Sequence, residues 1–172
     1  YGGSLEARMR FPLEVVTDLR AALGANYPIL YRFSQWKVDD YLELKFRTPD
    51  ELGLFVGALA EAGVDILHVS TRGATDVGFE ESGEKTLAGW ARELSGLPTI
   101  AVGKVSTTLP MDQAYGKEHD VVTDPGPAMA LLERGEADLL AVGRALIANP
   151  DWVEVVRDGD WNDLRPFEKS QL

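Results

Sequence analysis

Cysteine is absent from this 172-residue sequence, which excludes a disulfide framework and thiolate chemistry. Acidic residues outnumber basic ones by 28 to 17, and the resulting net charge of −11 argues against the basic face that is typical of nucleic-acid binding. No apolar run approaches the roughly 20 residues of a membrane helix, and we expect no signal peptide. These absences predict a protein without a nucleic-acid or membrane partner. We also expect a cytoplasmic location and a small-molecule substrate.

What the sequence does contain is enough apolar residue, 45% of the chain, for one domain with a core across residues 1–172. Short apolar segments that lack polar alternation are typical of parallel strands, because both faces of such strands are covered. Four segments have this character, and we predict them to be strands: 29–34, 65–70, 99–105 and 139–144.

Helical patterns lie before, between and after these segments, and each has a start or stop signal. The polar stretch 106–122 is predicted to be a loop with at most one short helix. The predicted helices are one with Pro12 in its first turn and Gly24 as its stop, one from a capping box at Thr48-Pro49-Asp50-Glu51 to Gly63, one from Leu87 to Gly96, one through Met129 to Gly135, and one from a cap at Asn149-Pro150 to Gly159.

Strands that alternate with helices pair in parallel, because each crossover needs a connection of helix length. Two architectures meet this requirement: a doubly wound open sheet and half of a (β/α)8 barrel, since a whole barrel takes about 250 residues. An open sheet usually has its phosphate loop after the first strand, whereas the glycines here follow the third and fourth strands. The chain also begins at Tyr1 without an initiator Met, so either its start was removed or it is part of a longer chain.

Gly103-Lys104 and Gly143-Arg144 end two consecutive predicted strands. Glycine at such a position lets backbone N–H groups approach an anion closely, and the guanidinium group of Arg144 suits a phosphate. In barrels, the loops after the last two strands are the usual phosphate site. The pair therefore predicts a phosphate site, and the alternative is two tight turns with surface charges.

Arg32 lies inside an apolar predicted strand, where an unpaired charge is costly. We interpret it as a side chain that faces a binding site and holds an electron-rich group such as the pyrimidine edge of a flavin. The alternative is a structural ion pair with a nearby acid.

His68 is interpreted as a hydrogen-bonded core residue, with a general-base role as the alternative, and neither it nor His119 belongs to a metal-ligand pattern. Ser70, Thr71 and Arg72 are better placed to line a site, at the end of the strand. Trp36 follows a strand directly and is predicted either to cover a ligand or to make a helix-capping contact. Two further sets have structural interpretations: the acids Glu80, Glu81 and Glu84 as a solvated face, and Trp90 and Trp152 as core packing.

These motifs resemble the Old Yellow Enzyme family of NAD(P)H:flavin oxidoreductases along essentially the whole chain. Residues 1–11, Tyr-Gly-Gly-Ser-Leu-Glu-Ala-Arg-Met-Arg-Phe, are similar to the family signature YGGS-x-ENR-x-RF, with Ala7 in place of the usual Asn. The later matches follow in the order of the family: residues 31–34, 67–70, 100–103, and 137–146 through Asn149-Pro150-Asp151.

The resemblance implies an α/β fold in which this chain is the C-terminal half, four βα units, of a TIM (β/α)8 barrel with parallel strands and with FMN at its mouth. It implies that Arg32 contacts the N1/O2 edge of the flavin and that Gly103, Gly143 and Arg144 hold the phosphate. Ser70 and Lys104 are further predicted cofactor contacts, and Trp36 is the predicted substrate contact. Lys104 stands where the family often has Gly or an apolar residue, so its backbone N–H is the expected donor. The segment 106–122 also departs from the common spacing of the family.

Members of this family reduce activated alkenes with NADH or NADPH. Their substrate-anchoring and proton-donating residues belong to the N-terminal half, so we expect no catalytic residue in this chain and little activity from it alone. Its partners would then be the missing N-terminal half-barrel and, through the exposed sheet, further copies of itself. Two alternatives stay open: a non-catalytic module that binds FMN or phosphate, and a phosphate-binding barrel enzyme without flavin.

Overall fold

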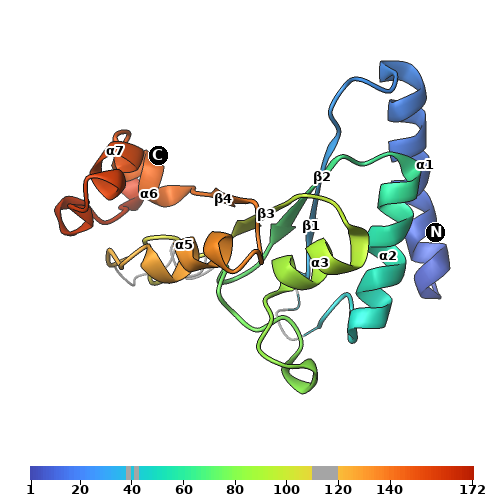
Figure 1. Cartoon of the computed structure of the whole chain (residues 1–172), viewed down its shortest axis with the longest axis horizontal. Helices are drawn as coiled ribbons and strands as arrows, with labels where there is room; N and C mark the ends of the chain where they lie inside the picture. Colours follow the sequence, from blue (N-terminus) through green and yellow to red (C-terminus); the bar gives the residue numbers. More distant parts are fainter. Residues whose placement is uncertain (38–39, 41–42, 110–119) are drawn as a thin grey trace.

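The computed structural model describes residues 1–37, 40, 43–109 and 120–172. Its centre is a four-stranded parallel sheet with the strand order β1-β2-β3-β4. Helices alternate with these strands along the chain (Figure 1). The strands are β1 (Leu30–Ser34), β2 (Ile66–Ser70), β3 (Thr99–Val102) and β4 (Leu139–Ala141). The helices are α1 (Leu5–Leu23), α2 (Pro49–Ala62), α3 (Leu87–Ser95), α5 (Gly126–Glu133), α6 (Arg144–Ala148) and α7 (Trp152–Arg157), with short 3-10 helices η1 (Glu80–Ser82), η2 (Trp161–Asp163) and η3 (Lys169–Gln171).

The strand order distinguishes between the two predicted architectures. A doubly wound sheet reverses its strand order at a switch point and carries helices on both faces. Here the strands are neighbours in chain order, and α1, α2 and α3 form one layer on a single side of the sheet (Figure 1). Consecutive parallel strands with their helices on one side are the arrangement of a (β/α)8 barrel wall, so the predicted fold class is confirmed.

The face of the sheet toward the helices forms the core. Phe33, Val69 and Ala101 occupy one row across β1, β2 and β3, and all three are buried. Phe55 of α2 stacks on Phe46 and meets Phe33 edge to face. Aromatic pairs of this kind add stability beyond the area that they bury.

On the opposite face of the sheet, several side chains are exposed in the described part of the chain. The next row in the register consists of Arg32, His68, Ile100 and Leu139, because side chains alternate between the faces of a strand. Leu139 is 52% exposed, and Leu30 on the same face is 53% exposed. The apolar runs therefore predicted parallel strands correctly, although this chain by itself covers only one of their faces.

Capping follows the sequence signals at α2 and α3. The hydroxyl group of Thr48 accepts a 3.2 Å hydrogen bond from the Glu51 N–H, and Gly63 ends α2 with a left-handed φ of 103°. Gly96 ends α3 in the same way, with a φ of 71°. The predicted capping box is only half formed, because the Glu51 carboxylate accepts from the N–H of Arg47 instead of that of Thr48.

The first helix differs from its prediction. It begins at Leu5, with the Ser4 hydroxyl accepting from the Ala7 N–H, so Pro12 lies in the helix interior and not in the first turn. Pro12 has no N–H for the preceding turn, a cost that the continuous helix tolerates. Val16 is buried, whereas Leu19 on the same helix is 44% exposed.

The predicted strands 99–105 and 139–144 are too long at their carboxyl ends, because β3 ends at Val102 and β4 at Ala141. Arg144 begins α6, which the sequence did not predict. The predicted cap at Asn149 is also wrong. The buried Asn149 amide bonds to the carbonyls of Ala145 and Arg165 and accepts from the Arg165 N–H, and α7 begins three residues later.

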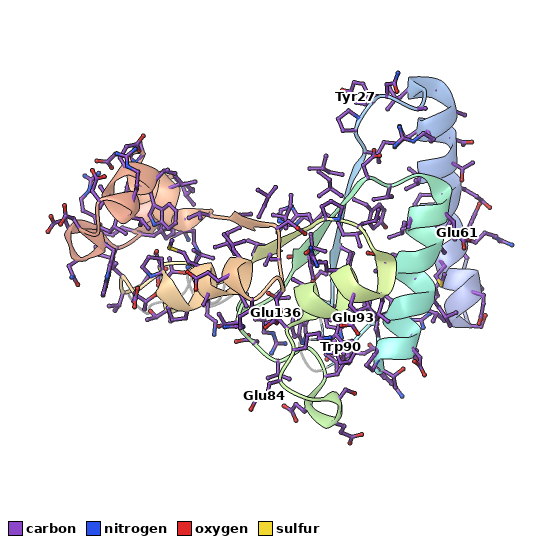
Figure 2. All side chains as sticks on the ribbon, in the orientation of Figure 1. Tyr27, Glu61, Glu84, Trp90, Glu93 and Glu136 are labelled. Atoms are coloured by element: carbon purple, nitrogen blue, oxygen red, sulfur yellow. The ribbon has the colours of Figure 1, made fainter. Side chains whose placement is uncertain are left out.

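The predicted surface and core roles of the acids and tryptophans are confirmed. Glu80, Glu81 and Glu84 are exposed, and Glu84 lies at the outer edge of the loop that precedes α3 (Figure 2). Trp152 is buried, and Trp90 is partly buried against the core. Residues 106–109 and 120–122 form neither helix nor strand, and the rest of the predicted loop lies outside the described residues. Among the helices of the described ranges, none has both the length and the apolar character to cross a membrane.

Candidate functional site

The carboxyl ends of the four strands enclose a cavity of about 620 Å³. In barrel proteins, the loops at this end of the strands carry the binding site. The cavity brings together every residue that the sequence singled out for a ligand: Arg32, Trp36, Ser70, Gly103, Lys104, Gly143 and Arg144. These residues come from four separate strand ends, so the parallel topology is what makes them neighbours.

Arg32 enters the cavity from the open face of β1. Its Nη2 group donates a 3.1 Å hydrogen bond to the Ser70 hydroxyl on β2. Within the described residues, Arg32 takes part in no ion pair, so the alternative of a structural pair with an acid has no support. The side chain is also exposed, which means that in this chain its charge does not bear the burial cost that the sequence suggested.

His68 lies beside Arg32 in the sheet register and also lines the cavity. Burial lowers the pKa of His68 below its usual value of 6.5, and the positive charge of Arg32 lowers it further. Its Nε2 atom is buried and has no hydrogen-bond partner in the part of the chain that the structure describes. His68 is therefore neutral at pH 7, and Arg32 carries the charge of this row.

The tip of β3 packs tightly against the tip of β2. Gly103 has a φ of 138°, and a Cβ atom at this position would lie 2.7 Å from the Thr71 carbonyl oxygen. The Thr71 hydroxyl donates to the Val102 carbonyl at 2.7 Å, and the Ala74 N–H donates to the Gly103 carbonyl at 2.9 Å. Only glycine fits this close approach without moving the two loops.

Lys104 continues the same turn, with a left-handed φ of 49°. A non-glycine residue in this region is uncommon and marks a backbone that its surroundings hold in place. Its ammonium group lies 3.8 Å from the Asp76 carboxylate. The Lys104 side chain is thus tethered to the β2 loop at the cavity rim.

Arg144 is more tightly held than the sequence predicted. Its Nη1 group donates to Asp120 Oδ2 at 2.7 Å, and its Nη2 group donates to the Thr107 hydroxyl at 3.4 Å and to the Leu109 carbonyl. The Arg144 side chain is 14% exposed and that of Asp120 only 2%. Sequence reasoning missed Asp120, because no local pattern links it to a partner 24 residues away.

Trp36 lines the same cavity, shortly after the end of β1. The Arg72 guanidinium group covers its ring at 5.0 Å from the centroid, a cation–π distance. Trp36 also forms an isolated antiparallel bridge with Leu44. It contacts Arg72 and Leu44, whereas the sequence had left a helix-capping contact open.

The charge of the cavity is opposite to that of the chain. Although acids outnumber bases overall, the described residues that line the cavity include no carboxylate. Basic side chains line it from all four strand ends: Arg32, Lys37, Arg72, Lys104 and Arg144. Such a wall attracts an anion. No group of three or more His, Cys, Asp or Glu residues suited to a metal ion occurs within the described ranges.

The fold and the cavity define this chain as part of a (β/α)8-barrel protein with a cationic, glycine-edged ligand site at the strand ends. The sequence matches the NADH:flavin oxidoreductase / NADH oxidase family over residues 1–162. The chain therefore belongs to that family, as its resemblance to the Old Yellow Enzymes predicted.

Individual relatives agree with this assignment. The NADH oxidase of Thermoanaerobacter brockii is 34% identical over 96% of this chain, which spans 23% of that protein. The 12-oxophytodienoate reductase 7 of Oryza sativa subsp. japonica is 34% identical over 91% of the chain, which spans 38% of it. A solved structure of morphinone reductase in complex with tetrahydroNAD superposes on 99% of the chain with a TM-score of 0.67 and 27% identity. The chain spans 39% of that structure, so it corresponds to part of a longer barrel protein.

Proposed function

We propose that this chain is the FMN-binding half of an NAD(P)H-dependent ene-reductase, within a single half-barrel that spans residues 1–172. Membership of the NADH:flavin oxidoreductase family supports this function. The observation that carries it is the cationic cavity, which is lined by Arg32 of β1 and by the glycine turns of β3 and β4. A flavin mononucleotide has a phosphate at one end and an electron-rich ring edge at the other, which matches these two parts of the cavity.

Each residue has a role in this proposal. Backbone N–H groups at Gly103, Lys104 and Gly143 would bind the phosphate together with Arg144, because open N–H groups and a guanidinium suit a dianion. Bound FMN would supply hydride transfer from NADH or NADPH to an activated alkene.

Arg32 would hold the pyrimidine edge of the flavin and stabilise its negative charge, because a preorganised cation is most effective where charge develops. The Ser70 hydroxyl, which accepts from Arg32 at 3.1 Å, fixes the direction of the guanidinium group. Trp36 is the proposed substrate contact, because it lines the same cavity. The residues that anchor the substrate and deliver its proton would come from the N-terminal half. A cytoplasmic location stays a prediction.

Arg32→Ala in the full-length protein tests this function. We expect hydride transfer from NADPH to the flavin to slow by about 100-fold, the order of effect seen when one preorganised donor is removed. Arg32→Lys should recover part of the rate, because it keeps the charge but not the planar fork. Stopped-flow bleaching of the flavin absorbance measures the step, and Arg157→Ala, at an exposed ion pair, serves as the control.

Two results would contradict the proposal. A full-length protein that keeps its flavin through gel filtration but never turns over would support a non-catalytic binding module. A colourless protein that a sugar phosphate stabilises would support a barrel enzyme without flavin.

A further inference from the structure

Asp120 binds two different partners with its two carboxylate oxygens. Oδ1 accepts from the N–H groups of Thr108 at 2.9 Å and Leu109 at 3.1 Å, from the Thr108 hydroxyl at 3.2 Å, and from the Val121 N–H at 3.1 Å. Oδ2 accepts from Arg144 at 2.7 Å. A carboxylate that is only 2% exposed must be paired, because an unpaired buried charge is strongly destabilising. One oxygen thus holds the loop after β3, and the other holds the guanidinium group at the cavity.

The remaining contacts of Arg144 define what it can still bind. A guanidinium group has five N–H donors. The described hydrogen bonds to Asp120, Thr107 and Leu109 use three of them, which leaves Nε–H and one Nη1–H. Arg144 also lines the cavity, and these two donors are what it has left for an anion bound there. The side chain is therefore fixed before a ligand binds, and this lowers the entropy cost of binding.

We infer that Asp120 is a positioning residue for the phosphate end of the cavity, acting through the guanidinium group of Arg144. This inference rests on the proposed function, because it assumes that the anion is the phosphate of FMN. If Asp120 served only to close the loop after β3, its loss would affect every flavin equally. A positioning role instead affects a flavin that carries a phosphate far more than one that does not, such as riboflavin.

Asp120→Asn in the full-length protein separates the two roles. The amide keeps an oxygen for the Thr108 and Leu109 N–H groups but turns a donor toward Arg144. We expect the affinity of the apoprotein for FMN to fall by about tenfold, as when a supporting partner of a binding residue is removed, and that for riboflavin to stay within about twofold. Quenching of flavin fluorescence during titration of the apoprotein measures both affinities.

Thr108→Ala is the matched control. It removes one contact to Oδ1 and leaves the bond between Oδ2 and Arg144 in place. Any loss of affinity in this variant should be the same for FMN and riboflavin. If Asp120→Asn does not fold, Asp120→Glu replaces it. The longer side chain displaces the carboxylate from Arg144, so this variant should also lower the ratio of FMN affinity to riboflavin affinity.

Equal losses for both flavins in the Asp120 variant, or no loss for either, would overturn the inference. Arg144→Gln distinguishes this failure from failure of the proposed function. If Arg144→Gln lowers the ratio of FMN affinity to riboflavin affinity and Asp120→Asn does not, the proposed site stands and only the role of Asp120 is wrong. If the wild-type apoprotein does not bind FMN more tightly than riboflavin, the proposed phosphate site itself is wrong.

Discussion

At the scale of single residues, charge along the open face of the sheet is kept to one site. Arg32 and His68 are direct neighbours on β1 and β2, and two positive charges at this spacing would repel. Burial and the guanidinium charge both lower the pKa of His68, so the imidazole stays neutral at pH 7. The effect leaves Arg32 as the single cation of this row, which suits a residue proposed to face the ring of a flavin.

The two glycines of the site are predicted to respond differently to alanine. Gly103→Ala should destabilise the protein by about 2 kcal/mol and abolish FMN binding, because position 103 has a positive φ and the added Cβ would clash with the backbone of the β2 loop. Its Cβ would lie 2.7 Å from the Thr71 carbonyl, whereas a Cβ at Gly143 meets nothing within 4 Å. Gly143→Ala should therefore leave thermal stability nearly unchanged while it weakens FMN binding. Equal stability of the two variants in thermal unfolding would contradict this account.

At the scale of elements, the same arrangement of an aspartate between a strand N–H and a helix arginine occurs twice at the amino-terminal end of the sheet. Asp65, just before β2, accepts from the Ile29 N–H at 2.7 Å and from Arg20 of α1. Asp138, just before β4, accepts from the Thr99 N–H at 2.9 Å and from Arg92 of α3. Each aspartate joins the start of a neighbouring strand to the helix that precedes that strand. The two pairs fix strand register at the end opposite the cavity.

These aspartates should make stability depend on pH. The hydrogen bond from Arg92 is the main cause that lowers the pKa of Asp138 below 3.8, followed by the Thr99 N–H. A carboxylate with a lowered folded-state pKa stabilises the protein above its unfolded pKa and loses that effect as pH falls through the folded value. Asp138→Asn should therefore lower the free energy of unfolding by about 1 kcal/mol at pH 7, a value that allows for the partial exposure of the Asp138 carboxylate.

The difference in stability between Asp138→Asn and the wild-type protein should become smaller as the pH falls below about 4. Thermal unfolding of the full-length protein from pH 7 to pH 3 measures it. Asp158→Asn is the control, because within the described residues the Asp158 carboxylate pairs with its neighbour Arg157 at the surface and with no other side chain. A constant difference at every pH would show that the charge of Asp138 contributes nothing.

At the scale of the whole molecule, the described residues leave one face of the sheet partly exposed, and β1 and β4 each pair with a described strand on one side only. Apolar side chains on that face, such as Leu30 and Leu139, are each more than half exposed. Exposed apolar patches and unpaired strand edges favour association. In a closed barrel the same surface is internal, so the chain carries an interior face that another set of strands must cover.

The isolated chain is therefore expected to self-associate. Leu139→Glu should shift it toward the monomer, because a charge on the open face opposes association. Leu54→Glu is the matched control, since Leu54 is 58% exposed but lies on α2, in the helix layer. Sedimentation velocity measures the outcome, and an isolated chain that is monomeric at all concentrations would contradict the prediction.

Local sequence signals predict the alternation of strands and helices, most helix ends and the residues that gather at the cavity. Apolar periodicity and caps such as Thr48 and Gly63 act over a few residues, so they can be predicted locally. The carboxyl ends of parallel strands must share one edge of the sheet, and this places Arg32, Gly103 and Gly143 together. Their proposed roles toward FMN stay predictions.

Contacts between segments distant in sequence, in contrast, follow from the tertiary fold alone. The bond between Asp120 and Arg144, the stacking of Arg72 on Trp36 and the burial of Asn149 against Arg165 leave no local pattern. Each depends on where a loop returns after leaving the sheet. Polar side chains pair with whatever donor or acceptor the folded backbone brings within reach, and that position is set by the packing of the whole chain.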